Sequence, residues 1–195
     1  MDDMTQRYYE ENTKPFVEST LLVDMGGLYC EFLPYIPAGG HILDLGCGSG
    51  RDSRVFLDGD FLVTALDGSP ALCKVAEQLI GQPVLCMDFL DISFEQEFDG
   101  VWACASLLHL ASEQIPTVLN KIARALKSGG VLYLSFKKGC FEGFRGGRYY
   151  TDLTEEAFDE MIAGVRALSI IKTWTTVDAR PDVHNEWLNA ILRAE

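Results

Sequence analysis

Residues 42–52 read Ile42-Leu43-Asp44-Leu45-Gly46-Cys47-Gly48-Ser49-Gly50-Arg51-Asp52, an apolar run that passes into three alternating glycines. Glycine permits a tight turn and lets a ligand approach the backbone closely. The helix expected after the turn offers free N–H groups in its first turn, where a polar or anionic ligand can bind. The pattern is typical of a strand, a ligand-binding turn and a helix in an open α/β sheet.

The spacing of these glycines argues against NAD or FAD as the ligand. The dinucleotide fingerprint is GxGxxG, whereas this chain has glycines at 46, 48 and 50 and an arginine at 51. An acid at the end of the second strand suits the two hydroxyls of a ribose, and Asp67 directly follows the run Thr64-Ala65-Leu66. The turn and the acid together predict a site for a different ribose-containing cofactor.

Strand-like and helical stretches alternate along the chain, which indicates βαβ units. Five short apolar runs read as buried parallel strands. Two β-rich runs near the end, separated by Arg180-Pro181-Asp182, predict an antiparallel hairpin. The expected fold is therefore α/β, with a seven-stranded, mostly parallel sheet. The expected strands are 41–45, 61–66, 83–87, 100–104, 131–136, 168–177 and 186–192, and the expected helices are 18–33, 51–57, 70–80, 113–126 (closed by Lys127 to Gly130) and one opened by Thr154.

The composition narrows the classes of function. A length of 195 residues favours one domain over 1–195, and a formal charge of −13 disfavours nucleic acid and anionic membranes as partners. The acidic N-terminus and the lack of a long apolar run predict a soluble, cytoplasmic protein. The six cysteines form no CxxC pair and the three histidines lie far apart, so reduced thiols and no metal site are expected.

The segment 44–50 resembles motif I of the class I S-adenosylmethionine (SAM)-dependent methyltransferases, and the later motifs follow in a similar order over nearly the whole chain. This resemblance implies a Rossmann-like three-layer sandwich, with SAM as cofactor and S-adenosylhomocysteine (SAH) as product. It implies that the glycine turn contacts the methionine part of SAM, that Asp44 orients its ammonium group and that Asp67 binds its ribose. Asp88 would meet the adenine amino group beside Phe89, and 98–106 would form the floor of the site. The cofactor-binding residues expected in this way are Tyr9, Asp44, Gly46, Cys47, Gly48, Gly50, Asp67, Gly68, Ser69, Asp88, Phe89 and Ala103.

Two further segments extend the resemblance. Leu107-Leu108-His109-Leu110 resembles an apolar segment with a histidine in many small-molecule members, and Tyr8-Tyr9-Glu10-Glu11-Asn12-Thr13 resembles the N-terminal segment of a subset that includes tellurite-resistance-like methyltransferases. The likeness implies that 1–40 is a helical lid over SAM, with Tyr9 as a contact. His109 is the candidate general base for an acceptor that must lose a proton, and a hydrogen-bonded boundary histidine is the alternative.

A basic, glycine-rich segment at 137–153 is expected to form a loop on the acceptor side. It carries four cations (Lys137, Lys138, Arg145 and Arg148) against few acids, and it contains the pair Tyr149-Tyr150. Because it follows the fifth strand, it lies at the edge where open α/β sheets bind ligands. It predicts a site for an anionic acceptor, with a solvated surface loop as the alternative. The acceptor-binding candidates are Arg145, Arg148, Tyr149 and Arg180.

The predicted function is methyl transfer from SAM to a small acceptor, which is anionic or a soft nucleophile. No Asn/Asp-Pro-Pro-Tyr follows the fourth strand, which argues against methylation of the exocyclic amines of bases or of glutamine. Cys104 lacks the preceding proline of cytosine-methylating enzymes and lies in an apolar strand, which argues against its being a nucleophile. Three alternatives stay open: a nucleotide-cofactor oxidoreductase, a non-catalytic SAM-binding regulator, and a macromolecular methyltransferase that needs a recognition partner. A monomer or a homodimer is expected.

Overall fold

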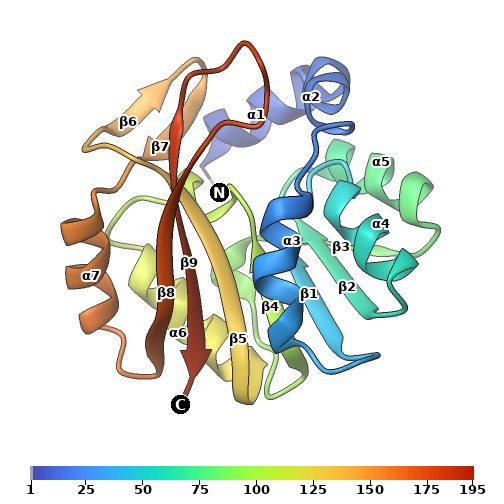
Figure 1. The fold of residues 1–195 in the computed structure, drawn as a ribbon. Coiled ribbons are helices and arrows are strands. Elements are labelled where there is room, and N and C mark those ends of the chain that lie inside the picture. Colours follow the sequence, from blue (N-terminus) through green and yellow to red (C-terminus); the bar gives the residue numbers. More distant parts are fainter. Residues whose placement is uncertain (1) are drawn as a thin grey trace.

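The computed structural model describes residues 2–195 and is built on a seven-stranded sheet (Figure 1). The strand order is β3-β2-β1-β4-β5-β9-β8. The first five strands pair in parallel, β9 runs antiparallel to β5, and β8 runs antiparallel to β9. The predicted α/β sheet with a C-terminal antiparallel hairpin is thus confirmed. The strands are β1 (His41–Leu45), β2 (Leu62–Asp67), β3 (Val84–Cys86), β4 (Phe98–Ala103), β5 (Leu126–Lys137), β8 (Leu168–Val177) and β9 (Glu186–Ala194).

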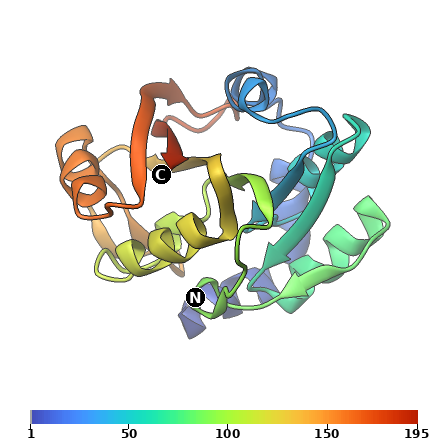
Figure 2. The same cartoon turned by 90° about the horizontal axis from the view of Figure 1, so that it is seen from below.

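Helices cover both faces of this sheet, as the end-on view in Figure 2 shows. α3 (Gly26–Phe32), α4 (Arg51–Asp58) and α5 (Pro70–Ile80) pack on one face, where Phe32 and Phe56 meet Trp102 of β4. α6 (Ile115–Ala125) and α7 (Glu155–Ala163) pack on the other face against the larger cluster of buried apolar residues. β4 is buried on both sides because Trp102 faces one cluster while its neighbours Val101 and Ala103 face the other, as parallel strands in such sandwiches do.

Two predicted helices differ from the structure. The single helix expected at 18–33 is wrong, because the chain forms α2 (Thr13–Thr20) and then α3, with a break between them. The Asp24 carboxylate accepts a hydrogen bond from Gly26 N at 2.8 Å, and Gly26 is the first residue of the second helix. α6 ends at Ala125, and residues 126–130 form an irregular beginning of β5 in which Gly129 has φ +75°.

The segment 137–153 contains a β-hairpin where a loop was expected. β6 (Glu142–Arg145) and β7 (Arg148–Thr151) pair antiparallel in a separate two-stranded sheet. Gly146 and Gly147 connect them with φ +59° and +81°, as a type I′ turn requires. The Gly-Gly pair is a hairpin signal that the sequence analysis missed, and its effect is to fix the orientation of the basic side chains on β6 and β7.

The N-terminal helices lie across the edge where the parallel strands end (Figure 1). α1 (Asp3–Glu11) is capped by the Asp2 carboxylate, and the Glu10 carboxylate accepts hydrogen bonds from Ser69 Oγ at 2.7 Å and Ala71 N at 3.1 Å at the beginning of α5. The β6–β7 hairpin and the connection between β8 and β9 lie at the same edge. Within residues 2–195, no helix has the length and apolar character needed to cross a bilayer.

Candidate cofactor and acceptor site

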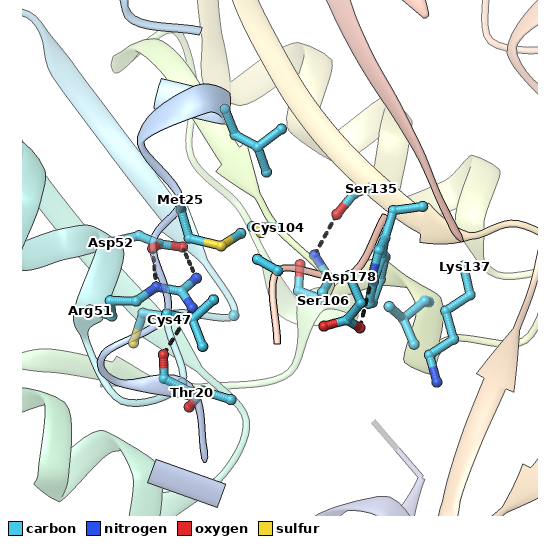
Figure 3. Close-up of a pocket in the computed structure, with 18 of the residues that line it drawn as sticks. Thr20, Met25, Cys47, Arg51, Asp52, Cys104, Ser106, Ser135, Lys137 and Asp178 are labelled. Carbon is cyan, nitrogen blue, oxygen red and sulfur yellow. Dashed lines mark hydrogen bonds and ion pairs between the residues drawn. The ribbon is translucent and has the colours of Figure 1, made fainter. Parts of the chain in front are cut away.

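A cavity of about 600 Å³ lies at the carboxyl ends of the parallel strands, beneath α1 and α2. Its volume falls in the range of roughly 300–1,000 Å³ that small-molecule sites occupy. Figure 3 shows Arg51 and Asp52 on one side of this cavity and Lys137 and Asp178 on the other. One continuous cavity therefore joins the glycine turn to the end of β5. This cavity can hold two ligands side by side.

The glycine turn between β1 and α4 forms one wall. Gly46 N and Cys47 N both donate to the Leu66 carbonyl, at 2.8 and 3.0 Å, so the turn is tied to β2. Gly46 has φ +82°, and a Cβ at this position would lie 2.4 Å from Ser106 Cβ. Only glycine fits there, because the backbone conformation is left-handed and the neighbouring loop leaves no room for a methyl group.

Asp67 at the end of β2 is oriented by the same turn. Its Oδ2 accepts a hydrogen bond from Gly48 N at 2.9 Å and its Oδ1 accepts one from Ser69 N at 2.8 Å. Burial raises the pKa of this carboxyl, and the backbone donors act in the opposite direction. An ionised carboxylate has about four acceptor positions, and Asp67 lines the cavity, so it can accept from a ligand hydroxyl in addition to these backbone donors.

Asp52 in the first turn of α4 is the centre of a buried network that the sequence analysis missed. Its carboxylate accepts hydrogen bonds from Tyr29 Oη at 2.6 Å and Trp102 Nε1 at 2.8 Å. It also forms an ion pair with Arg51, whose Nη1 donates to the Thr20 carbonyl at 3.2 Å (Figure 3). No sequence pattern joins a residue of α3, one of α4 and one of β4, so only the tertiary structure reveals this network.

The predicted site residues divide into those that line the cavity and those that do not. The residues that line it are Tyr9, Gly46, Cys47, Gly48, Asp67, Gly68, Phe89, His109, Arg148 and Arg180. Those outside its lining are Asp44, Gly50, Ser69, Asp88, Ala103, Arg145 and Tyr149. The structure therefore brings residues far apart in sequence into one site, while several expected contacts lie behind its walls.

Asp44 and Asp88 illustrate what the residues behind the walls do. Asp44 is only 2% exposed and accepts a hydrogen bond from Ser53 Oγ at 2.6 Å. Burial and the nearby Asp52 raise the pKa of Asp44 to about 8. Asp88 caps the short helix η2 (Phe89–Asp91) by accepting from Leu90 N at 2.8 Å. Both carboxylates accept hydrogen bonds from groups of the protein behind the cavity wall. Their contacts to SAM stay predictions.

His109, in the short helix η3 (Leu107–His109), is held by both ring nitrogens. Its Nδ1 lies 2.6 Å from the Tyr149 carbonyl, which can only accept, so Nδ1 carries the proton. Nε2 then accepts from Tyr9 Oη at 2.8 Å. Burial lowers the pKa of His109 to about 4. The ring is neutral near pH 7 and both of its nitrogens are hydrogen-bonded within the protein, and its role as a base stays a prediction.

We expect His109 to make the protein less stable as the pH falls. Its pKa lies below the value of about 6.5 that an unfolded chain has, so the unfolded state binds more protons between about pH 6.5 and pH 4. The free energy of unfolding should therefore fall by up to about 1.4 kcal/mol per pH unit from this residue in that window. Urea denaturation of wild type and His109→Gln at several pH values measures the difference.

The control for this experiment is His184→Gln, which changes an exposed histidine in the connection between β8 and β9. It should keep the acid dependence of the wild type. Because other buried groups also titrate, only the difference between variants is interpreted. An acid dependence in His109→Gln as steep as that of the wild type would show that the histidine is not buried in its neutral form.

Comparison with known proteins shows what part of this chain is similar to. Residues 42–130 match the family described as "Methyltransferase domain". A curated relative, the cypemycin N-terminal methyltransferase of Streptomyces, is 34% identical over 122 residues, which are 60% of this chain and 50% of the relative. The chain spans about half the length of the curated relatives that it matches, between 40% and 59% for the first three.

Solved structures show the same fold over nearly the whole chain. The 1,6-didemethyltoxoflavin-N1-methyltransferase of Burkholderia thailandensis, solved with its substrate and SAH, is similar with a TM-score of 0.77 and 20% identity, covering 96% of this chain and 84% of that one. A TehB-like SAM-dependent methyltransferase of Corynebacterium glutamicum has a TM-score of 0.71 and 22% identity, with full coverage of both chains. At these identities the likeness confirms the predicted Rossmann-like fold, and the tellurite-resistance-like subset stays a prediction.

Proposed function

We propose, from the premise that this chain carries a SAM-dependent methyltransferase domain with SAM as its cofactor, that the protein methylates a small acceptor that is anionic or a soft nucleophile. The observation that carries the proposal is the single cavity, which has the glycine turn and Asp67 at one end and cations at the other. Such an arrangement can hold a cofactor and an acceptor in contact. A whole enzyme of this class needs little more than that, because the methyl donor brings its own leaving group.

The residues around the glycine turn fit SAM. Asp67 lines the cavity and is held by the Gly48 and Ser69 amides, so a ribose diol there can donate to its carboxylate. Ser106 Oγ is buried in the cavity wall without a hydrogen-bond partner among the described residues, so a polar ligand can satisfy it. When bound, SAM supplies an electrophilic methyl group on a sulfonium.

The protein's own residues would then bind, orient and exclude water. α1 and α2 cover the cavity, and Phe16 of α2 lies over the turn, 3.3 Å from where a Cβ on Gly48 would stand. Tyr9 presents its hydroxyl to the cavity while His109 holds it in place. A soft acceptor needs no base, and an acceptor with a proton to lose can pass it through Tyr9 Oη to His109 Nε2.

Calorimetric titration with SAH and with NADH tests the cofactor, using the variants Asp67→Asn and Asp58→Asn. Asp58 is an exposed acid on α4 that pairs with Arg54, so it is the matched control. Losing a charge-assisted contact to a hydroxyl costs about 1.5–3 kcal/mol, so SAH should bind Asp67→Asn about tenfold to a hundredfold more weakly. Asp58→Asn should bind SAH as the wild type does.

Two results would reject this proposal. Tighter binding of NADH than of SAH would point to an oxidoreductase, and wild-type affinity in Asp67→Asn would show that the ribose lies elsewhere. Transfer of a labelled methyl group from SAM to any small acceptor would exclude a non-catalytic regulator. Transfer that appears only with a protein partner or with RNA would favour a macromolecular methyltransferase over the small-molecule reading.

A further inference from the structure

Two of the four cations around the acceptor end of the cavity are already neutralised by a carboxylate. Arg145 donates to both oxygens of Asp152, at 3.1 and 3.0 Å. Arg180 donates in the same way to both oxygens of Asp178, at 2.8 and 2.7 Å. A paired arginine offers little charge to a ligand, because two of its donors are directed at the carboxylate and its field is compensated. Of the four predicted acceptor-binding residues, these two therefore serve to hold the walls.

Lys137 and Arg148 are the exceptions, and both line the cavity. Lys137, the last residue of β5, has its Nζ 4.2 Å from the centre of the Tyr150 ring, and it forms no ion pair within residues 2–195. The Arg148 guanidinium carbon lies 5.3 Å from the centre of the same ring. Its Nε is buried and has no hydrogen-bond partner in the part of the chain that the structure describes. Arg145 lies over the same ring, 4.7 Å from its centre, but is paired with Asp152. Three cations thus gather around one ring, and Lys137 and Arg148 are the two that have no ion-pair partner among residues 2–195.

This gathering is electrostatically unfavourable in the protein alone. Burial lowers the pKa of Lys137 to about 8, and the neighbouring Arg145 and Arg148 act in the same direction. Asp152 partly offsets them, although its carboxylate is already bonded to Arg145. An anion between Lys137 and Arg148 would relieve the repulsion and would satisfy the unpartnered Arg148 Nε.

The walls beside these two cations are aromatic. Tyr133 of β5, Trp174 of β8 and Trp187 of β9 line the cavity, and the rings of Tyr133 and Trp174 lie 6.1 Å apart between centres. Their polar atoms are partly used within the protein: Tyr133 Oη donates to Asn189, and Trp187 Nε1 donates to Asp178. Tyr133 is fully buried and stacks on Trp102 with 4.0 Å between ring centres, so it supports the wall from behind. The partly exposed indoles of Trp174 and Trp187 are suited to packing against another flat ring.

We propose that Lys137 and Arg148 bind the carboxylate of an aromatic acceptor whose ring packs against Trp174 and Trp187. The inference rests on the proposed methyltransferase function and narrows its acceptor to one chemical class. It also assigns Lys137, which lies outside the acceptor-binding residues predicted from the sequence, as a main anion ligand. Tyr150 holds the two cations through its electron-rich ring, and Arg145 and Arg180 support the walls.

Calorimetry on the protein saturated with SAH tests the inference. The probes are benzoate, salicylate and 4-hydroxybenzoate, each compared with its carboxamide, which has the same ring and no charge. We expect the carboxylates to bind and the amides to bind about tenfold or more weakly. Lys137→Met should reduce the carboxylate affinity by about tenfold or more while leaving SAH affinity unchanged.

Lys138→Met is the matched control. Lys138 is the neighbouring lysine in sequence, but its Nζ pairs with Glu155 at 2.9 Å and it does not line the cavity. Its removal should leave the affinities for both SAH and the carboxylates unchanged. Equal affinity for acids and amides, failure of the SAH complex to bind any of the three acids, or wild-type carboxylate affinity in Lys137→Met would each overturn the inference. Loss of SAH affinity in Lys137→Met would assign the cations to the cofactor and would overturn it as well.

SAH binding by the wild type is measured first, so a failure of the proposed methyltransferase function is distinguished from a failure of this inference.

The pH dependence of carboxylate binding gives a second readout. Carboxylate affinity should fall between about pH 7 and pH 9, since Lys137 loses its proton there while Arg148 and Arg180, whose pKa values are raised, stay charged. Arg145 and Asp152 are bonded to each other, and Tyr150 stays neutral because burial raises its pKa. Lys137→Met should lose this pH dependence, and a variant that retains it would also overturn the inference.

Discussion

Replacing Gly46 with alanine is expected to weaken SAH binding by about a hundredfold, which corresponds to about 2.7 kcal/mol. The new Cβ would stand 2.4 Å from Ser106 Cβ, and the residue would have to keep φ at +82°. The clash is with a loop that is packed on both sides, so the glycine turn has to move. Because Gly48 N also orients Asp67, a displaced turn disturbs the ribose-binding carboxylate at the same time. Calorimetry with SAH measures the effect.

Gly81→Ala separates the clash from backbone strain. Gly81 ends α5 with φ +75°, similar to that of Gly46, but nothing lies within 4 Å of a Cβ built there. This variant should lose about 1–2 kcal/mol of stability through the left-handed conformation and should bind SAH as the wild type does. If Gly46→Ala also binds SAH normally, the turn is not packed against the cofactor and the assignment of this wall is wrong.

The fold could be predicted from the sequence because its signals are local. The expected strand 41–45 and helix 70–80 agree with β1 and α5 residue for residue. The strand is marked by a short apolar run between glycines, and the helix by a proline that follows a serine cap. Each signal lies within a few residues of the chain. The break at 21–25 was missed because it depends on one side chain, Asp24, that accepts a hydrogen bond from the first residue of the next helix. In the sequence, a single carboxylate of this kind is outweighed by the apolar periodicity of 18–33, which looks like one continuous helix.

The site could be predicted only where backbone geometry dictates it. The glycine turn and Asp67 follow from strand order, because neighbouring parallel strands end at the same edge of a sheet. The charge state of the acceptor end could not be predicted, because Arg145 and Lys137 look alike in sequence until Asp152 is seen to pair with one of them. The Asp52 network is of the same kind, since its partners come from elements far apart in the chain.

Replacing Asp52 with alanine is expected to lower the free energy of unfolding by about 3–5 kcal/mol, as the removal of one partner of a buried ion pair does. The change leaves the Arg51 guanidinium without its carboxylate. It also leaves two more buried donors, Tyr29 Oη and Trp102 Nε1, without an acceptor. Since Tyr29 belongs to α3 and Arg51 bonds to the end of α2, the loss should loosen both helices as well. Urea denaturation gives the stability, and hydrogen exchange of the amides in α2 and α3 reports the loosening.

Asp58→Ala shows what the same substitution does without burial. Asp58 lies on the same helix and also pairs with an arginine, Arg54, at 2.7 Å, but the side chains of both are about half exposed. An exposed pair of this kind contributes about 0.2–1 kcal/mol, so this variant should unfold close to the wild type. A similarly small effect for Asp52→Ala would mean that water reaches Arg51 and replaces the carboxylate. In that case the network would be part of an open cavity wall, and α3 would be held to the sheet by the packing of Phe32 and Tyr29 on Trp102 alone.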